Sequence, residues 1–221
     1  MSDLPILGAA MSVADIPEFA DWILADQRDL EIQDPCRDGF YEGDTVRVAD
    51  DARRYLDGYT GRLGVHAVFS GIHLTVSDRV FVKAYQTRLL ETRASEIDCK
   101  LVLENIFDTD TTPLNTLVST IDSSYLRRSI DVGHSHLMAQ RGGPPADIWV
   151  QETGALLEHV HLADNDGMSD RHWRPGLGDI AWHAVFKELG KLEHSPRLIL
   201  EIAKDTLLPA TQWLNEQGLA R

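Results

Sequence analysis

The stretch His159-Val160-His161-Leu162-Ala163-Asp164-Asn165 is a short apolar run that ends in polar residues. Six other runs share this character, because each is short and nearly continuous in apolar side chains. Such runs are expected of strands that are buried on both faces of a sheet. These six runs lie at residues 5–11, 30–32, 63–69, 101–104, 129–132 and 198–202.

Amphipathic stretches separate these runs. Ser12 and Asp15 suggest a capping box that opens a helix. Its apolar face carries Ile16, Phe19, Trp22 and Ile23. Strand and helix then alternate, which predicts βα units and a parallel sheet. The first run is not followed by a G-x-G-x-x-G turn, so we favour a TIM-type (β/α) barrel over a doubly wound open sheet. The other predicted helices span residues 45–56, 78–97, 114–121, 146–157, 181–189 and 208–216.

Composition limits both the class of protein and its partners. The 221 residues are 43% hydrophobic and 25% charged, which is typical of a globular protein, and we find no linker; we expect a single barrel domain over residues 1–221. The net charge of −14 makes a nucleic-acid partner unexpected. Two distant cysteines, no basic leader and no long apolar run favour a cytoplasmic protein without a membrane span.

Four potential metal ligands fall at or near the carboxyl ends of strand-like runs. Glu104, Asp131, His161 and Glu201 are separated by 27, 30 and 40 residues, about one βα unit each. A barrel points such residues at one opening, where an O,O,N,O set suits Mn²⁺, Mg²⁺, Co²⁺ or Zn²⁺. The alternative is a set of buried ion pairs that line the barrel mouth without a metal.

Around these motifs the chain resembles the xylose isomerase-like TIM-barrel superfamily, which includes sugar isomerases, ketose 3-epimerases and the endonuclease IV type of nuclease. The resemblance implies that Glu104, Asp131, His161 and Glu201 form a metal tetrad. It also implies that Glu104 and Glu201 are the acid/base pair. The matching segments are residues 103–106, 129–134, 159–165, 175–182 and 200–202.

Other polar residues are candidates for the same site. His134 matches a position that touches substrate in the epimerases and metal in the nuclease, whereas His66, Asp170 and His172 match further metal ligands of the nuclease. Trp173 is a candidate for stacking on a sugar ring. Arg174 is a candidate for orienting a substrate hydroxyl or carboxylate, or else is merely solvated.

Spacing predicts that the barrel is shortened. A regular TIM barrel has eight strands, and this chain offers seven runs. Residues 78–97 read as one long helix in the place where the superfamily has its fourth strand. We therefore expect seven strands instead of eight, with a gap whose exposed edges favour a homodimer.

These features together favour a divalent-metal-dependent isomerase or epimerase that acts on a small, polyhydroxylated, sugar-like carbonyl compound. Proton abstraction beside a carbonyl requires a Lewis acid and a carboxylate within reach of the carbon. Two alternatives stay open at this point, namely an endonuclease IV-like phosphodiesterase and a degenerate barrel without catalytic activity.

Overall fold

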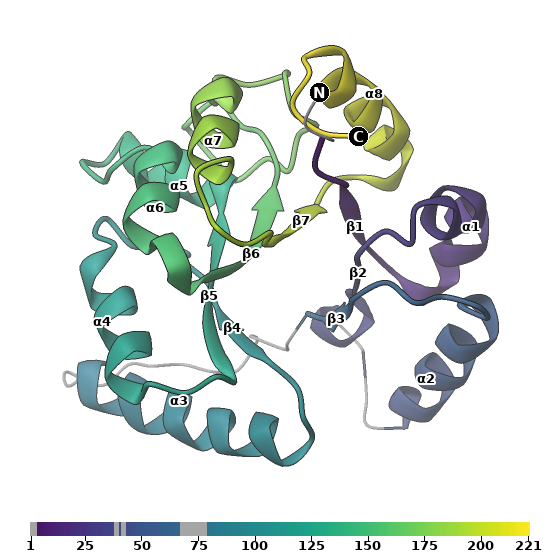
Figure 1. Cartoon of the computed structure of the whole chain (residues 1–221), viewed down its shortest axis with the longest axis horizontal. Helices are drawn as coiled ribbons and strands as arrows, with labels where there is room; N and C mark the ends of the chain where they lie inside the picture. Colours follow the sequence, from purple (N-terminus) through teal and green to yellow (C-terminus); the bar gives the residue numbers. More distant parts are fainter. Residues whose placement is uncertain (1–3, 38–39, 41–42, 67–78) are drawn as a thin grey trace. The chain divides into compact units, whose positions relative to one another are not determined.

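A computed structural model describes residues 4–37, 40, 43–66 and 79–221 (Figure 1). The chain divides into two compact units, each built of strands and helices. The first unit is Met1–Ile72 with Arg197–Arg221, and the second is His73–Pro196. The expectation of one domain over residues 1–221 stays a prediction.

The first unit contains four parallel strands in the order β3-β2-β1-β7. The strands are β1 (Gly8–Met11), β2 (Leu30–Ile32), β3 (Leu63–Val65) and β7 (Arg197–Leu200). The helices are α1 (Ile16–Ala25), α2 (Asp44–Tyr55) and α8 (Leu207–Glu216), with short 3-10 turns η1 (Val13–Asp15), η2 (Asp34–Cys36) and η4 (Lys204–Thr206).

Helix α1 shows the packing that its sequence pattern predicts. Ile16, Phe19 and Ile23 are buried along one face, and Trp22, which was predicted on the same face, is half-buried. The predicted capping box is wrong, however, because the Ser12 hydroxyl donates to Asp34 Oδ1 at 2.9 Å instead of capping the helix. A carboxylate from the segment after β2 competes successfully for that hydroxyl.

The second unit contains three parallel strands in the order β4-β5-β6. The strands are β4 (Leu101–Leu103), β5 (Leu126–Asp131) and β6 (Leu157–Leu162). The helices are α3 (Arg79–Glu96), α4 (Thr112–Ile121), α5 (Val132–Ala139), α6 (Ala146–Thr153) and α7 (Trp182–Leu189), with a 3-10 turn η3 (Gly154–Leu156).

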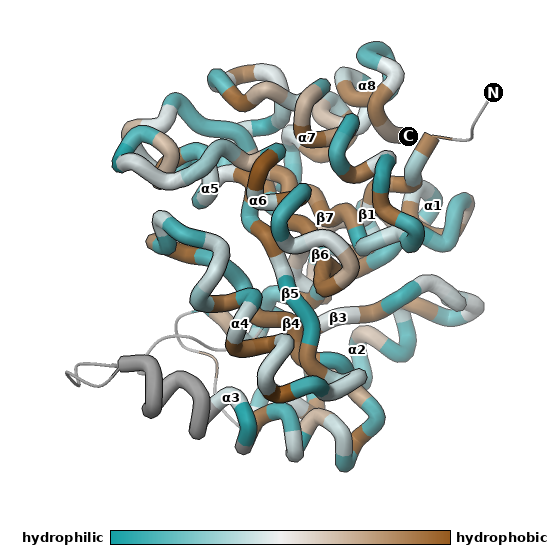
Figure 2. The backbone as a smooth tube through the Cα atoms, turned by 60° about the vertical axis from the view of Figure 1, so that its left-hand side comes forward, coloured by the Kyte–Doolittle hydropathy of each residue, from teal (hydrophilic) through white to brown (hydrophobic). Residues whose placement is uncertain are grey.

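Hydropathy follows the strands, as their apolar sequences require. Figure 2 shows brown, hydrophobic segments along β6 and along β7. In β6, Leu157, Val160 and Leu162 are fully buried, and in β7 so are Ile199 and Leu200. Burial of this kind is expected of strands in a parallel sheet that helices cover.

Three local predictions differ from the structure in the second unit. Strand β5 begins at Leu126 and includes Arg127 and Arg128, whose charges hid it in the sequence. Helix α5 begins directly after β5 at Val132, which we predicted to be the last residue of the strand. The helix predicted over 146–157 ends at Thr153, because Gly154 takes a positive φ of 51° and turns the chain into η3 and β6.

The predicted fold class is confirmed as a shortened (β/α) fold of TIM-barrel type. The described ranges contain seven strands, one fewer than a regular barrel. Helix α3 occupies the interval that we predicted as a single helix. Residues 67–69 of the predicted third strand lie outside the described residues. Within those ranges, no helix combines the length and the apolar character that crossing a membrane requires.

Candidate metal centre

The three parallel strands of the second unit bring their carboxyl ends to one edge. Glu104 directly follows β4, Asp131 is the last residue of β5, and His161 lies in β6 opposite Asp131 in the register. Asp131 and His161 are buried. This edge is where a (β/α) barrel places its active site.

Asn105 holds the ends of β4 and β5 together. Its side-chain oxygen accepts from the Asp131 amide at 2.9 Å, and its Nδ2 donates to the Asp131 carbonyl at 3.2 Å. The Asp131 carboxylate accepts the His134 amide at 2.7 Å and so caps α5. Asn105 and this cap fix the backbone on which Glu104, Asp131 and His134 stand.

Carboxylates and imidazoles converge at this edge. Glu104 Oε1 lies 3.3 Å from His134 Nδ1, and Glu104 Oε2 lies 3.2 Å from His161 Nδ1. His161 Nδ1 lies 3.9 Å from Asp131 Oδ2. Ligand atoms of Glu104, Asp131 and His134 all fall within 4.8 Å of one another. The oxygen and nitrogen donors fit a divalent cation of the Mn²⁺, Mg²⁺, Co²⁺ or Zn²⁺ type.

The charges of these groups depend on one another. Burial raises the pKa of the Glu104 carboxyl, but His161 and His134 outweigh it and hold this pKa well below its usual range. Burial lowers the pKa of His134, whereas hydrogen bonds with Asp170 and Glu104 outweigh it and raise this pKa to about 11. Glu104 is therefore an anion at neutral pH, as both a metal ligand and a general base must be.

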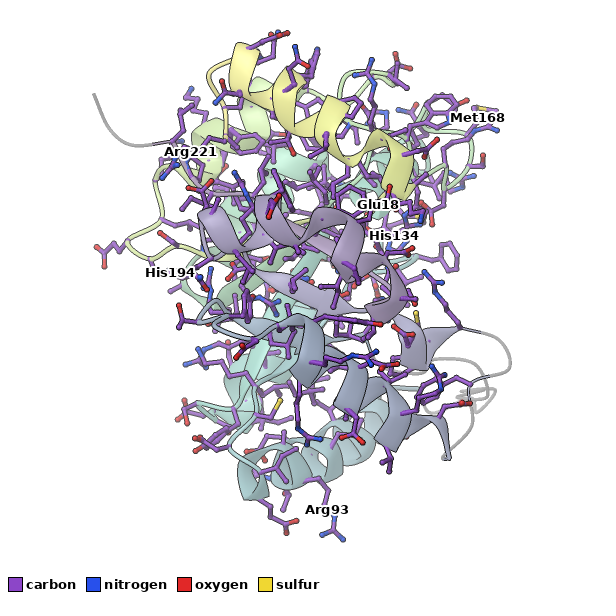
Figure 3. The ribbon with its side chains drawn as sticks, turned by 90° about the vertical axis from the view of Figure 1, so that its right-hand side faces the viewer. Glu18, Arg93, His134, Met168, His194 and Arg221 are labelled. Carbon is purple, nitrogen blue, oxygen red and sulfur yellow. The ribbon has the colours of Figure 1, made fainter. Side chains whose placement is uncertain are left out.

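The loop after β6 extends the cluster. Asp170 Oδ2 lies 3.2 Å from His134 Nε2 and 3.1 Å from His172 Nε2. Burial raises the pKa of Asp170, but these two histidines outweigh it and hold the pKa below its ordinary value. Figure 3 labels His134 of α5 and Met168, an exposed residue of the loop after β6. Asp170 thus connects His134 to His172.

Asp164 anchors that loop. Its fully buried carboxylate accepts from the amides of Asn165 at 3.0 Å, Gly176 at 2.8 Å and Ile180 at 3.4 Å, and from Trp182 Nε1 at 2.9 Å.

The returning part of the loop passes very close to the strand end. A Cβ atom at Gly178 would lie 2.1 Å from the Asn165 carbonyl oxygen, so only glycine fits there. The loop that carries Asp170 and His172 is consequently built into the unit rather than loosely attached to it.

Trp173 and Arg174 occupy the same loop. The Trp173 backbone pairs with Asp164 in both directions, at 2.8 and 3.0 Å. The Arg171 guanidinium carbon lies 5.3 Å from the centre of a Trp173 ring. Arg174 Nη1 donates to the Pro175 carbonyl at 3.2 Å. Their predicted contact with substrate stays a prediction.

The first unit carries the remaining two candidates, His66 and Glu201. Glu201 follows β7 and His66 follows β3, and His66 Nε2 lies 3.8 Å from Glu201 Oε1. Gln33, which follows β2, donates from Nε2 to the same oxygen at 2.8 Å. Gln33 was not among the residues predicted from the sequence. The only available signal was its place just after a strand-like run.

The structure therefore groups the predicted site residues by unit. The second unit brings together six residues: Glu104, Asp131, His134, His161, Asp170 and His172. The first unit brings together His66 and Glu201. Each group lies at the carboxyl ends of parallel strands, where the sequence placed it.

The fold and this edge of carboxylates and histidines define a TIM-barrel-type (β/α) protein with a candidate divalent-metal centre. A family described as "Xylose isomerase-like TIM barrel" matches residues 37–220. The chain belongs to this family, which confirms the resemblance drawn from the sequence motifs.

Two solved structures share this fold, and one curated relative matches part of the sequence. A xylose isomerase domain protein from Planctomyces limnophilus shares 15% identity at a TM-score of 0.69, covering 98% of this chain and 97% of that chain. A D-tagatose 3-epimerase-like protein shares 20% identity at a TM-score of 0.57, covering 93% and 85% respectively. An uncharacterized protein of Methanocaldococcus jannaschii is 32% identical over 87 residues, which are 38% of this chain and only 28% of that protein.

Proposed function

We propose that this protein is a divalent-metal-dependent isomerase or epimerase of a small, polyhydroxylated, sugar-like carbonyl compound. The observation that carries the proposal is the convergence of Glu104, Asp131, His134 and His161 at the carboxyl ends of β4, β5 and β6. The similarity to a D-tagatose 3-epimerase-like protein supports the same class of enzyme.

In this proposal, four residues hold the metal: Glu104, Asp131, His161 and Glu201. A bound divalent cation supplies a Lewis acid that stabilises negative charge developing on a substrate carbonyl oxygen. Glu104 and Glu201 are the acid/base pair, one removing a proton from the carbon beside the carbonyl and the other returning a proton. An isomerase and an epimerase begin with the same proton abstraction, and the proposal covers both.

The remaining candidates bind and orient the substrate. His134 is held between Asn105, Glu104 and Asp170, with its Nδ1 2.9 Å from the Asn105 carbonyl. A ring fixed in this way is suited to holding a substrate oxygen. Trp173 and Arg174 are proposed to contact the substrate from the loop after β6. A homodimer and a cytoplasmic location belong to the same proposal.

Hydrogen exchange at carbon tests the proposal directly. A panel of ketoses and aldoses is incubated with the protein and Mn²⁺ in D₂O, and NMR follows deuterium incorporation beside the carbonyl. The expected result is incorporation with at least one sugar that stops when EDTA removes the metal. If no sugar exchanges at any tested metal concentration, the proposed function is wrong.

One observation favours a second candidate, a metal-dependent phosphodiesterase. His134, Asp170 and His172 form a row of additional nitrogen and oxygen donors beside Glu104. The net charge of −14 opposes this candidate because a phosphodiester substrate is itself an anion. Metal analysis separates the two, since three zinc ions per chain with cleavage of an abasic duplex would indicate the phosphodiesterase.

A further inference from the structure

A fully buried arginine lies directly beneath the candidate centre. Arg128 stands in β5 opposite Leu103 of β4 and is 0% exposed. Its Nη2 atom has no hydrogen-bond partner among the described residues. Burying a guanidinium in a strand is costly, and an apolar residue of similar length would fill the same volume without that cost. The presence of an arginine here calls for a specific reason.

The hydrogen bonds of Arg128 point to that reason. Its Nη1 donates to the carbonyl of Leu103, in the peptide group that joins Leu103 to Glu104. Its Nε donates to Asn115 Oδ1 at 3.1 Å on helix α4. The guanidinium thus ties the backbone that bears Glu104 to the helix layer outside the strands.

The other end of this connection is also fixed. Asn115 Nδ2 donates to the Glu152 carbonyl of helix α6 at 3.1 Å. A continuous set of contacts therefore runs from α6 through Asn115 and Arg128 to the residue that precedes Glu104. A register shift in β5 between Arg128 and Ser129 marks the place where the strand is irregular. Such irregularities commonly re-aim side chains beside active sites.

Arg128 also keeps its positive charge despite being buried. Burial lowers the pKa of Arg128 to about 10, and the carboxylates of Asp108 and Glu104 oppose that effect. The group is therefore a cation at neutral pH, and the Glu104 carboxylate is one of the two anions that oppose the effect of burial.

We infer that Arg128 is a positioning residue that holds Glu104 in place for metal binding. It acts through its hydrogen bonds to the Leu103 carbonyl and to Asn115, and it does not touch the metal or the substrate. This inference rests on the proposed function, because it assigns Glu104 to a metal ion.

The test compares metal affinity with stability. Arg128→Met removes the charge and both hydrogen bonds, while Val118→Ala destabilises the same layer through a small cavity on α4, where Val118 is buried. Titration with Mn²⁺ followed by calorimetry gives the affinity, and thermal melting gives Tm. Removing a group that orients a metal ligand typically costs about 10- to 100-fold in affinity.

The expected result is that Arg128→Met weakens Mn²⁺ binding by about 10- to 100-fold and lowers Tm by a few degrees. Val118→Ala should lower Tm similarly and leave the affinity unchanged. Equal Mn²⁺ affinity in Arg128→Met and in the wild-type protein would overturn the inference. If Arg128→Met does not fold, Arg128→Lys and Asn115→Ala take its place, and unchanged affinity in both would overturn it equally.

A second readout separates this inference from the proposed function. Amide hydrogen exchange of residues 101–107 should be faster in Arg128→Met than in Val118→Ala, without any metal present. If the wild-type protein binds no divalent metal, the proposed function fails and so does the assignment of Arg128 to metal binding. Faster amide exchange in Arg128→Met would then still show that Arg128 holds the backbone beside Glu104. Unchanged exchange would overturn this positioning role too.

Discussion

The two units hold their candidate carboxylates in different ways. In the second unit, Glu104 lies within 3.3 Å of two imidazoles, which hold the pKa of its carboxyl below the usual range. In the first unit, Glu201 accepts a hydrogen bond from the neutral amide of Gln33 at 2.8 Å, with His66 at 3.8 Å. An amide orients a carboxylate without compensating its charge. The comparison teaches that Glu104 lies close to two imidazoles, whereas at Glu201 a neutral amide takes the near position and the imidazole of His66 lies farther away.

The largest effect should come from removing the Glu104 carboxylate. Glu104→Gln keeps the shape of the side chain but removes its charge and its ability to accept a proton. We expect carbon-bound deuterium exchange to fall by about 10²- to 10⁴-fold, the usual contribution of a general acid or base. NMR in D₂O with an exchanging sugar measures the loss.

Glu158→Gln is the matched control for that change. Glu158 pairs with Lys100 at 2.8 Å in the same unit and lies outside the cluster. The Glu158→Gln variant should catalyse deuterium exchange of the sugar at the wild-type rate. Full activity in Glu104→Gln would remove this residue from the chemistry.

The next effect concerns the loops that follow the strands. Asp164 accepts four N–H donors while fully buried, and Asp34 in the first unit accepts two, from Ser12 Oγ at 2.9 Å and the Val13 amide at 2.7 Å. Hydrogen bonds to charged groups contribute about 1.5–3 kcal/mol each and do not add fully. Asp164→Ala should therefore lose about 3–5 kcal/mol of unfolding free energy, and Asp34→Ala about 2 kcal/mol. Urea denaturation measures both.

The contrast between these two variants fails if Asp34→Ala costs as much as Asp164→Ala. Asp166→Ala serves as the half-buried control within the Asp164 loop. Its carboxylate accepts from the Met168 amide at 3.0 Å and from Arg171 Nη2 at 3.2 Å, and both partners are exposed, so the loss should stay well below that of Asp164→Ala.

A smaller effect should follow from removing the neutral partner of Glu201. Gln33→Leu removes the Nε2 donor that lies 2.8 Å from Glu201 Oε1, so this hydrogen bond no longer orients the carboxylate. Loss of such an orienting contact typically weakens metal binding by about 10-fold or more, and Mn²⁺ calorimetry measures it. Gln212→Leu, an exposed change on α8, should bind Mn²⁺ normally. Wild-type Mn²⁺ affinity in Gln33→Leu would mean that the hydrogen bond from Gln33 does not orient Glu201 for metal binding.

The smallest effect compares two residues with positive φ. Gln27 has φ 50° and Asp122 has φ 49°. The Gln27 side chain accepts from the Thr60 amide at 2.5 Å, whereas Asp122 is exposed and ends α4. Asp122→Gly should therefore raise the unfolding free energy by about 0.5–1 kcal/mol, because glycine adopts this conformation without steric cost. Gln27→Gly should lower the unfolding free energy, because it removes the hydrogen bond to Thr60. Denaturant melts in which both variants change the unfolding free energy in the same direction would contradict the comparison.

The elements that sequence predicted best are those whose signal is local. All seven strands were visible as short apolar runs, because burial on both faces demands apolar side chains. Strand β5 was predicted too short because Arg127 and Arg128 look unlike a buried strand, and yet Arg128 is fully buried. Its partners are the Leu103 carbonyl and Asn115, and the sequence gives no sign of such contacts.

The same distinction applies to the site. Glu104, Asp131 and His161 were predictable because each is a charged or polar residue at or near the end of an apolar run. That signal can be read from the local sequence alone. The roles of Gln33 and Asn105 were not predictable, because each depends on a partner that is 168 and 26 residues away respectively. Pattern shows which side chains are expensive to bury, whereas only the fold shows what supports them.

The close approach at Gly178 has a consequence for the history of this chain. Since a single carbon atom there would collide with the Asn165 backbone at 2.1 Å, natural selection has had one acceptable residue at that position for as long as the loop has followed this path. Relatives that have diverged in substrate should still carry glycine where their chains align with position 178. A relative with any other residue there must route the loop differently, and it marks a branch whose active site has been rebuilt.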